Sequence, residues 1–263
     1  MKIAHLSDLH FSRSTSRSLL GSLAADIEET APDVIAVSGD ITDRGRNYQY
    51  RGVLEFLESL GRDVVMTPGN REVCASTFWE WMIPSLSMRR YRSYVGMSDR
   101  IVYRSEKHRL LIIGLNSVHF FPSWPGKVSR ESRYWFRSMA SEYGDYFKVL
   151  VLHHPVAPVI RGSSFWAHQL SDAAAILRIC FEHGVRLILQ GHKHRSSFLE
   201  LREPESPSNV IISACGAPVM NRGDRIYHLI EIDDGVIRAR PREYVNDRFV
   251  EKALYTFEAV TKR

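Results

Sequence analysis

Continuous apolar runs alternate with segments of helical periodicity at the start of the chain. Three runs typical of buried strands occur at residues 2–6, 33–38 and 63–67. Between them, residues 18–29 and 48–60 place apolar side chains at the spacing of an amphipathic helix, and Gly61 follows the second segment, where helices prefer to end. The order strand, helix, strand, helix, strand predicts right-handed crossovers and a largely parallel sheet.

The alternation of strand and helix patterns is interrupted at residues 72–100 and then continues. Residues 72–100 are rich in Trp, Phe, Met and Arg and form a candidate cap insert over the substrate, with a helix packed on the core as the alternative. Beyond the insert, the pattern predicts strands at 101–104, 109–116, 147–152 and 186–190, and helices around 130–143 and at 171–183. After residue 196 it predicts strands at 197–201, 210–214, 226–232 and 236–240, with a hairpin turn at Asp234-Gly235.

The composition is that of one globular domain. With 263 residues, 44% hydrophobic and 25% charged, we expect a single domain over residues 1–263. The sequence has no run of about 18 apolar residues that would predict a membrane span, and its first residues lack the apolar segment of a signal peptide. Cys74, Cys180 and Cys215 are widely spaced, which is typical of free thiols in a reducing cytoplasm, the predicted location.

The charge balance is basic, with a formal net charge of +5 and a pI near 9.1. It suits an anionic partner such as a phosphate ester, a lipid-linked nucleotide, a nucleic acid or an acidic lipid headgroup. Apart from Arg89, Arg90 and Arg92 the basic residues are scattered, which disfavours the long basic groove of a nuclease. A small-molecule phosphate ester is therefore the favoured partner, while peripheral membrane contact stays open.

Residues able to bind a metal ion follow five of the predicted strands. They are Asp8 and His10, Asp40, Asn70, His153 and His154, and His192 and His194. In open α/β sheets ligands bind at the carboxyl ends of the strands, so these side chains are expected to converge. A lone histidine or Gly-Asp pair is usually a packed or turn residue, but five such placements together indicate a metal site. Carboxylate, imidazole and amide ligands suit Mn, Fe or Zn.

The same residues occur in five short motifs that resemble a known family. Asp8-Leu9-His10, Gly39-Asp40, Gly69-Asn70, His153-His154 and Gly191-His192-Lys193-His194 look like the calcineurin-like metallophosphoesterase family over residues 8–194. The resemblance implies an α/β fold, a four-layer αββα sandwich with two mixed central sheets flanked by helices, as in metallo-dependent phosphatases. It also implies two divalent or trivalent transition metal ions bridged by one carboxylate. Asp8, His10, Asp40 and His194 would hold one ion, and Asp40, Asn70, His153 and His192 the other.

The implied chemistry is hydrolysis without a protein nucleophile. Two cations about 3.5–4 Å apart lower the pKa of a bridging water and neutralise charge on the phosphoryl oxygens. The predicted function is a dinuclear-metal-dependent phosphohydrolase that cleaves phosphodiester bonds, of a cyclic nucleotide or a general diester, by metal-activated hydroxide. Asp40, Arg71 and His154 are the catalytic candidates.

Arg71 departs from the family pattern, which usually has a histidine that assists the leaving group as an acid. Arginine stays protonated and cannot be a general acid, but its guanidinium can clamp phosphate oxygens. Asn70-Arg71-Glu72 resembles the UDP-2,3-diacylglucosamine pyrophosphatase branch, whereas HLSDLH, TDRG and LHHP look more like the cyclic-nucleotide phosphodiesterase branch. We therefore expect Asn70 and Arg71 to bind substrate, with an ion pair between Arg71 and Glu72 or another acid as the alternative.

Other functions stay open at this point. A pyrophosphatase acting on a UDP-linked lipid A precursor, a nuclease, and a catalytically silent scaffold like the retromer subunit of the same fold all remain alternatives. Asp43 is a candidate to orient a histidine ligand or to form a turn, and His154 is a candidate to reach the leaving group. The histidines outside the motifs are expected to be structural, namely His5, His108, His119, His168, His183 and His228.

Overall fold

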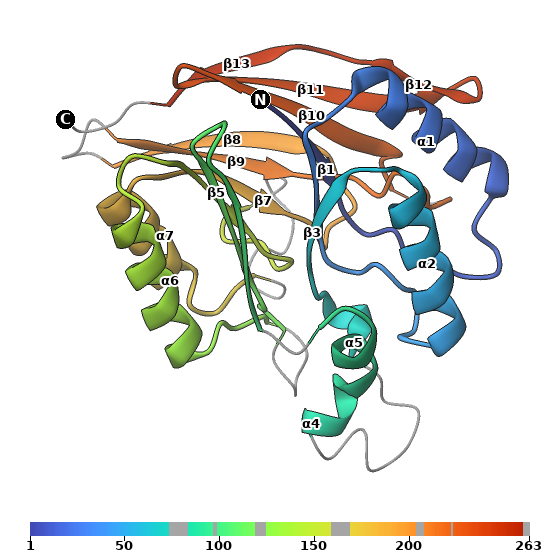
Figure 1. The fold of residues 1–263 in the computed structure, drawn as a ribbon, viewed down its shortest axis with the longest axis horizontal. Helices are drawn as coiled ribbons and strands as arrows, with labels where there is room; N and C mark the ends of the chain where they lie inside the picture. The colour runs from blue at the N-terminus through green and yellow to red at the C-terminus, as the bar shows by residue number, and fades with distance from the viewer. Residues whose placement is uncertain are drawn as a thin grey trace.

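The structure, a computed structural model, describes residues 1–73, 84–96, 99–118, 125–158, 169–203, 208–221 and 223–259. Within these residues one sheet has seven strands in the order β12-β11-β10-β1-β2-β3, with β13 paired to β11. The strands are β1 (Lys2–Leu6), β2 (Val34–Ser38), β3 (Asp63–Thr67), β10 (Ile226–Asp233), β11 (Val236–Val245), β12 (Arg248–Glu251) and β13 (Tyr255–Glu258). β1, β2 and β3 are parallel, as predicted, so their carboxyl ends meet at one edge (Figure 1).

A second sheet, within the same described residues, has six strands in the order β4-β5-β6-β7-β9-β8. They are β4 (Arg100–Ser105), β5 (Leu110–Leu115), β6 (Phe147–Val151), β7 (Val185–Gln190), β8 (Ser197–Arg202) and β9 (Asn209–Ala214). β5, β6, β7 and β9 are parallel, and the edge strands β4 and β8 are antiparallel to their neighbours. In the first sheet β10 is antiparallel to both β1 and β11, so both sheets are mixed.

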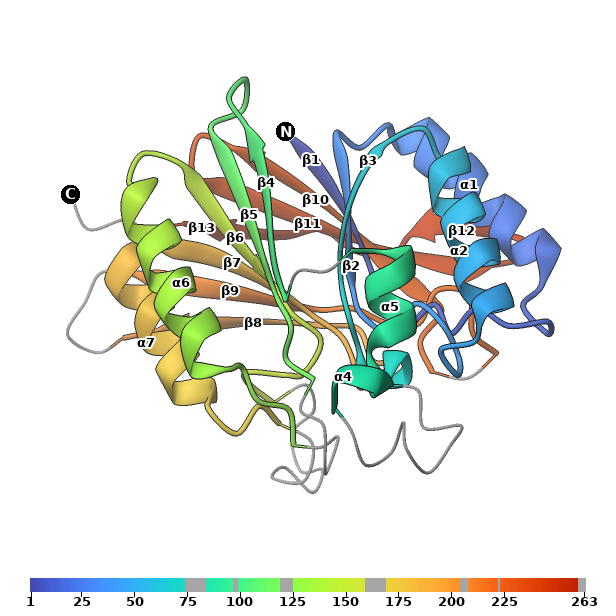
Figure 2. The same cartoon turned by 60° about the horizontal axis from the view of Figure 1, so that its bottom comes forward.

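Four of the described helices cover the two outer faces of the paired sheets, namely α1 (Arg17–Thr30), α2 (Asn47–Ser59), α6 (Arg130–Glu142) and α7 (Ala173–His183) (Figure 2). The short helices η1 (Asn70–Glu72), α4 (Pro84–Ser87) and α5 (Arg89–Tyr94) follow β3 in the chain. Figure 2 shows α1 and α2 on one side and α6 and α7 on the other, with both sheets between them. Buried apolar side chains such as Ile3, Val34, Leu110 and Leu187 fill the space between the sheets. The predicted αββα sandwich is confirmed.

Local sequence explains where several helices begin and end. Ser16 precedes α1 and accepts a hydrogen bond from the Leu19 amide, and Ser129 caps α6 through the Ser132 amide in the same way. Gly184 ends α7 in the left-handed conformation that glycine adopts most readily. The predicted helix and strand boundaries agree with the structure to within about two residues in most elements.

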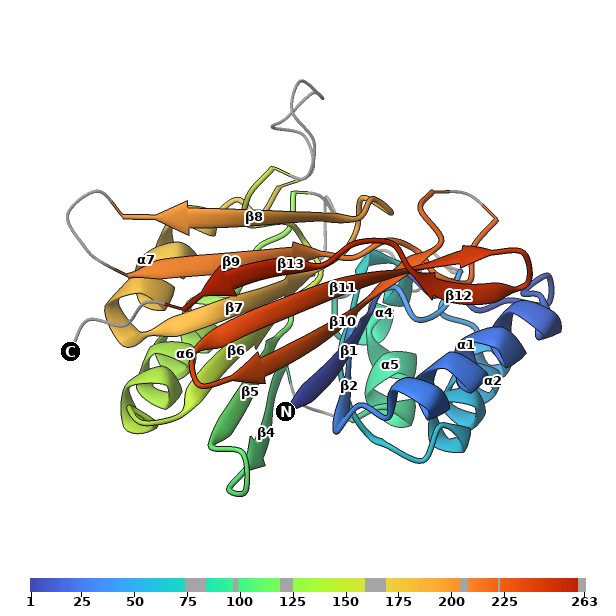
Figure 3. The same cartoon turned by 90° about the horizontal axis from the view of Figure 1, so that it is seen from above.

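Two short strands were not predicted. β12 and β13 carry mixed polar and apolar residues, and both pair with β11, which runs five residues beyond its predicted end at residue 240. β13 also contacts the second sheet, where the rings of Phe257 and Phe198 lie 6.1 Å apart and Asn209 donates to the Glu258 carbonyl (Figure 3). The C-terminal strands therefore help to join the two sheets.

The insert at 72–100 is described in part. Residues 74–83 and 97–98 lie outside the described residues, so the predicted cap stays a prediction. The described part packs on the core, because the ring of Tyr94 on α5 stacks on Tyr50 of α2 at 5.2 Å, and buried Tyr91 donates to the Met66 carbonyl. Among the described residues, no helix has the length and apolarity required to cross a membrane.

Candidate metal centre

The seven residues expected to bind metal come together where five strands end. Asp8 and His10 follow β1, Asp40 follows β2, Asn70 follows β3, His153 follows β6, and His192 and His194 follow β7. Backbone hydrogen bonds align the loops, since the Asp8 amide donates to the Gly39 carbonyl at 3.0 Å and the Gly191 amide donates to the His153 carbonyl at 3.1 Å. The two sheets therefore contribute to one cluster.

The backbone of these loops is held in an unusual conformation. Five of the seven residues have positive φ, namely Asp8 (51°), His10 (43°), Asp40 (50°), His192 (75°) and His194 (52°). A left-handed non-glycine residue costs about 1–2 kcal/mol, and such residues concentrate at functional sites. This concentration of strain indicates that the loops are shaped for a ligand.

Four side chains form a first group around one point. Asp8, His10, Asp40 and His194 each offer one ligand atom within 4.8 Å of the others and could hold a metal ion. The Nε2 atoms of His10 and His194 lie 3.1 Å apart, and Nε2 of His194 lies 3.2 Å from Oδ1 of Asp8. Oδ2 of Asp40 lies 3.5 Å from Nε2 of His10.

A second group lies beside the first. Oδ1 of Asn70 is 3.0 Å from Nε2 of His153 and 2.9 Å from Nδ1 of His192, and the two imidazole nitrogens are 3.1 Å apart. Oδ1 of Asp40 lies 3.6 Å from Nε2 of His153. Each carboxylate oxygen of Asp40 therefore faces a different group.

These spacings fit metal coordination. Two ligand atoms bound to one ion at about 2.0–2.2 Å lie roughly 3.0–3.5 Å apart in octahedral or tetrahedral geometry. Among the described residues, Oδ1 of Asp8 is buried and accepts no hydrogen bond, although a buried carboxylate oxygen normally has a partner. A cation would supply that partner, so the donor set matches a metal site.

Electrostatics keep two of the candidate ligands, His192 and Asp8, in the protonation state that binds a metal ion. Burial, followed by the nearby His153 and His154, lowers the pKa of His192 far below its usual range, so its imidazole is neutral. Burial alone would raise the pKa of Asp8, but the imidazoles of His10 and His194 hold it well below the usual range. Asp8 is therefore ionised.

Neighbouring groups fix the orientation of the candidate ligands. Oδ2 of Asp8 accepts from the Ser7 hydroxyl at 2.6 Å and from the His192 amide at 2.9 Å, while Nδ1 of His153 donates to the Ser38 carbonyl at 2.9 Å. A Cβ on Gly69 would lie 2.2 Å from Oδ1 of Asp40, so only glycine allows this approach. These contacts leave one atom of each side chain facing the cluster.

Glu72 is a positioning residue that the sequence reasoning missed. Its carboxylate is fully buried and accepts from the Thr42 amide, the Thr42 hydroxyl and the Gly69 amide at 2.7–3.0 Å. Burial, followed by the charge of Asp40, raises its pKa to about 8. Glu72 thus ties the β2 and β3 loops together, and the expected alternative of an ion pair between Glu72 and Arg71 is wrong.

The remaining candidates lie at the border of the cluster. The Arg71 amide donates to Oδ1 of Asp40 at 2.8 Å, and its side chain is exposed. His154 is fully buried, lies 3.0 Å from the Ser117 hydroxyl, and its ring centroid is 4.8 Å from that of His192. Asp43 pairs with Arg44 at 3.3 Å. A catalytic role for His154 stays a prediction.

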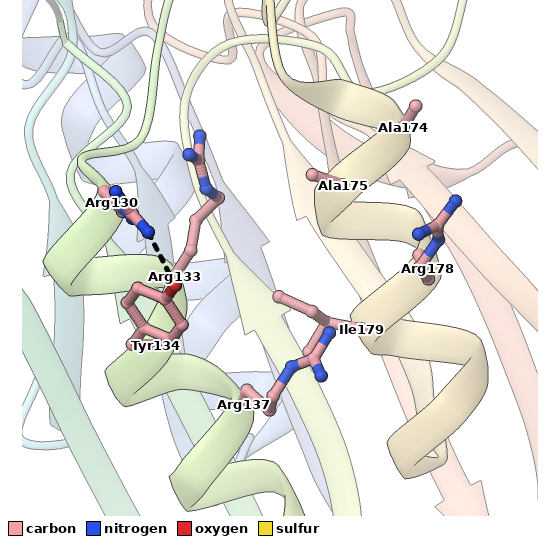
Figure 4. A pocket seen from close by; sticks show the side chains of 8 residues that line it. All are labelled: Arg130, Arg133, Tyr134, Arg137, Ala174, Ala175, Arg178 and Ile179. Carbon is pink, nitrogen blue, oxygen red and sulfur yellow. Dashed lines mark hydrogen bonds between the residues drawn. The ribbon is translucent and has the colours of Figure 1, made fainter.

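A separate cavity of about 480 Å³ lies between α6 and α7 and contains none of the candidate residues (Figure 4). Three of its four arginines have local partners: Arg133 pairs with Asp172, Arg137 pairs with Glu182, and Arg130 donates to the Tyr134 hydroxyl. The groove is lined by residues of the first turns of α6 and α7.

Residues 1–196 match the sequence model of the family described as calcineurin-like phosphoesterase. The chain belongs to this family. The resemblance noted from the five motifs is therefore confirmed over three quarters of the sequence.

Known members and solved structures agree with this assignment. The chain is 26% identical over 172 residues to a glycerophosphodiester phosphodiesterase of Enterobacter lignolyticus, covering 60% of this chain and 58% of the relative. It is 27% identical over 213 residues to a cAMP/cGMP dual specificity phosphodiesterase of Mycobacterium tuberculosis, covering 74% and 62%. A dimetal phosphatase from Danio rerio has the same fold, with a TM-score of 0.71, 13% identity and 99% of both chains covered. The chain spans about six tenths of the length of the two curated relatives.

Proposed function

We propose that this chain is a dinuclear-metal-dependent phosphohydrolase that cleaves phosphodiester bonds. The observation that carries the proposal is the position of Asp40, whose Oδ2 lies 3.5 Å from Nε2 of His10 and whose Oδ1 lies 3.6 Å from Nε2 of His153. A carboxylate placed between two groups of ligand atoms is suited to bridge two ions. Family membership supports the same assignment.

The ligand sets follow the two groups. Asp8, His10, Asp40 and His194 would hold one ion, and Asp40, Asn70, His153 and His192 would hold the other. Mixed carboxylate, amide and imidazole donors suit Mn, Fe or Zn. When bound, a pair of such ions lowers the pKa of water and neutralises the charge of a phosphoryl group.

The protein's own groups bind and orient the substrate. Arg71 extends from the Asp40 contact toward solvent, where its guanidinium can clamp phosphoryl oxygens. The Ser38 carbonyl holds Nδ1–H of His153, so that Nε2 presents its lone pair to the cluster. His154 packs against His192, and we assign it to positioning, with leaving-group catalysis as the outcome to be tested.

Small phosphodiesters are the proposed substrates. Relatives are named for cyclic nucleotides and for glycerophosphodiesters, which share one scissile diester group. Arg71 favours a diphosphate as the second candidate, because a phosphate leaving group needs less proton donation than an alkoxide. A lipid-linked nucleotide is one member of that second class.

Metal analysis combined with turnover tests the proposal. The Mn-loaded chain should bind about two ions and hydrolyse bis(p-nitrophenyl) phosphate, and Asp40→Ala should abolish turnover and release at least one ion. Asp233→Ala is the matched control, because Asp233 lies at the end of β10, beyond the amino end of β1 and thus opposite the cluster. Two bound ions without turnover of any diester or diphosphate would favour the catalytically silent scaffold.

A further inference from the structure

A cavity of about 770 Å³ opens beside Asn70, on the α2 side of the metal cluster. Its volume is typical of a pocket for a small-molecule ligand. Five arginines line it, namely Arg44, Arg46, Arg51, Arg71 and Arg90. We call it the arginine pocket.

The five arginines come from segments that are far apart in the sequence. Arg44 and Arg46 lie in the loop after β2, Arg51 is on α2, Arg71 is in η1 and Arg90 is on α5. Gln49 orders the loop by accepting from the Arg44 and Arg46 amides at 3.0 and 3.1 Å, and Arg90 donates to the Gly45 carbonyl at 3.4 Å. The fold therefore gathers these side chains around one space, at the positive N-terminal end of α2.

The charge of the lining is strongly positive. Among the described lining residues, Asp43 is the only acid, and it pairs with Arg44. Within the described lining, five guanidinium groups and one carboxylate sum to a charge of +4. Clustered like charges repel each other, and a cleft lined by one sign of charge concentrates ligands of the opposite sign. An anion is therefore the ligand that suits this space.

Only two residues with apolar or aromatic side chains line the pocket among the described residues. They are Val73 and Tyr48, and the guanidinium of Arg13 already lies over the Tyr48 ring at 5.0 Å. A nucleobase or an acyl chain would find little surface to pack against. A phosphate group, which guanidinium groups bind in bidentate fashion, matches the lining better.

The scissile phosphate does not account for this charge. Two divalent ions carry +4 and the carboxylates of Asp8 and Asp40 carry −2, so the metal cluster alone would neutralise a diester with one negative charge. The arginine pocket adjoins that cluster, because Asn70 belongs to both and the Arg71 amide donates to Asp40 at 2.8 Å. The additional positive charge thus lies one group away from the reacting phosphate.

We propose that the arginine pocket binds a second phosphate group of the substrate. This inference rests on the proposed phosphohydrolase function and narrows its substrate class. The class is that of phosphodiesters with at least one further phosphate, such as nucleoside diphosphate esters. Cyclic nucleotides, which carry a single charge, leave the pocket empty and are poorer substrates.

Calorimetry on the full chain in EDTA tests the pocket without any turnover. Adenosine, AMP and ADP keep the nucleoside constant while the phosphate charge increases. We expect ADP to bind at least 10-fold more tightly than AMP. The double variant Arg46→Gln/Arg51→Gln should lose at least 10-fold in ADP affinity, so that its affinities for ADP and AMP become similar. Arg178→Gln is the control, since Arg178 is exposed on α7 in the opposite helical layer, and it should bind ADP like the wild type (Figures 2 and 4).

Turnover of the Mn-loaded chain extends the test. The ratio of kcat/KM for ADP-ribose to that for cyclic AMP should exceed one in the wild type and fall at least 10-fold in the double variant. Absence of bis(p-nitrophenyl) phosphate turnover by the wild type would contradict the proposed function, while ADP binding still reports on the pocket.

Three results would overturn the inference. These are equal affinities for AMP and ADP, an unchanged ADP affinity in the double variant, and a preference for cyclic AMP over ADP-ribose. Tighter binding of a decathymidylate strand than of ADP, lost in the double variant, would assign the pocket to nucleic acid instead.

Discussion

Individual side chains in the cluster divide their polar atoms between the protein and the ligand site. Oδ2 of Asp8 accepts hydrogen bonds from Ser7 and His192, while Oδ1 faces the cluster. Nδ1 of His153 donates to the Ser38 carbonyl, while Nε2 faces the cluster. This division fixes the carboxylate rotamer and the imidazole tautomer before any ion binds. Ligand groups held in this way lose little freedom on binding.

Ser7 provides a direct test of this orientation. Ser7→Ala removes the donor 2.6 Å from Oδ2 of Asp8 without changing a candidate ligand. Because the loss of such outer contacts typically weakens metal binding about 10–100-fold, we expect a decrease of that size in a Mn titration. Ser22→Ala, on the exposed side of α1, is the control. A Mn affinity equal to that of the wild type would contradict a role for Ser7.

Substitution of Arg71 tests which leaving group the enzyme prefers in its substrate. Arg71→His restores the usual family residue, which can donate a proton where arginine cannot. We expect kcat on diesters with alkoxide leaving groups to rise about 100-fold or more, as is typical of general acid catalysis, and turnover of diphosphate substrates to fall. A parallel decrease on both substrate classes would show that Arg71 binds substrate without selecting the leaving group.

At the scale of helices and strands, the sequence predicts the elements and the site position that depend on local patterns of apolar and polar residues. The runs predicted at 2–6, 33–38 and 147–152 are recognisable because strands buried on both faces are mostly apolar. The polar residues after each run then predict the position of the site. Long-range pairs leave no such local signal, so the burial of Glu72 against Thr42 and the link between α1 and β11 could not be predicted.

The link between α1 and β11 depends on Asp26. This buried carboxylate pairs with Arg242 of β11 and accepts from the Tyr227 hydroxyl of β10. Removing one partner of a buried pair leaves the other charge uncompensated, which costs about 3–5 kcal/mol. We therefore expect Asp26→Ala to lose that much free energy of unfolding in urea, whereas Glu28→Ala on the exposed side of α1 should change it little. A loss below about 1 kcal/mol would contradict the pairing.

The two sheets are joined along their shared face, and the cluster of candidate metal ligands lies at one end of that junction. Asp8, Asp40 and Asn70 come from the first sheet, and His153 and His192 come from the second. Deeper in the same junction, Ser213 of β9 lies within hydrogen-bond distance of both His5 of β1 and His228 of β10, at 2.9 and 2.7 Å. The histidines expected to be structural thus include two that join the sheets.

This buried pair makes the fold sensitive to acid. Burial lowers the pKa of His228 to about 3, and burial followed by His228 lowers that of His5. A histidine in the unfolded chain titrates near pH 6.5, so between pH 6.5 and 3 the unfolded state binds a proton that the folded state excludes. The stability that His228 contributes is therefore complete above about pH 6.5 and decreases as the pH falls toward 3.

The contribution of His228 to the pH dependence of the unfolding free energy should be measurable in the EDTA-treated chain, where metal release does not contribute to that dependence. For His228, lowering the pH from 7 to 5 should cost the wild type about 2 kcal/mol of unfolding free energy, because pH 5 lies about 1.5 units below the pKa in the unfolded chain. His228→Gln cannot take up that proton, so its loss over the same interval in urea should be smaller by about 2 kcal/mol, even if the variant is less stable at pH 7. His228→Asn should behave in the same way. An equal loss in the wild type and both variants would place the acid sensitivity of the sheet junction elsewhere.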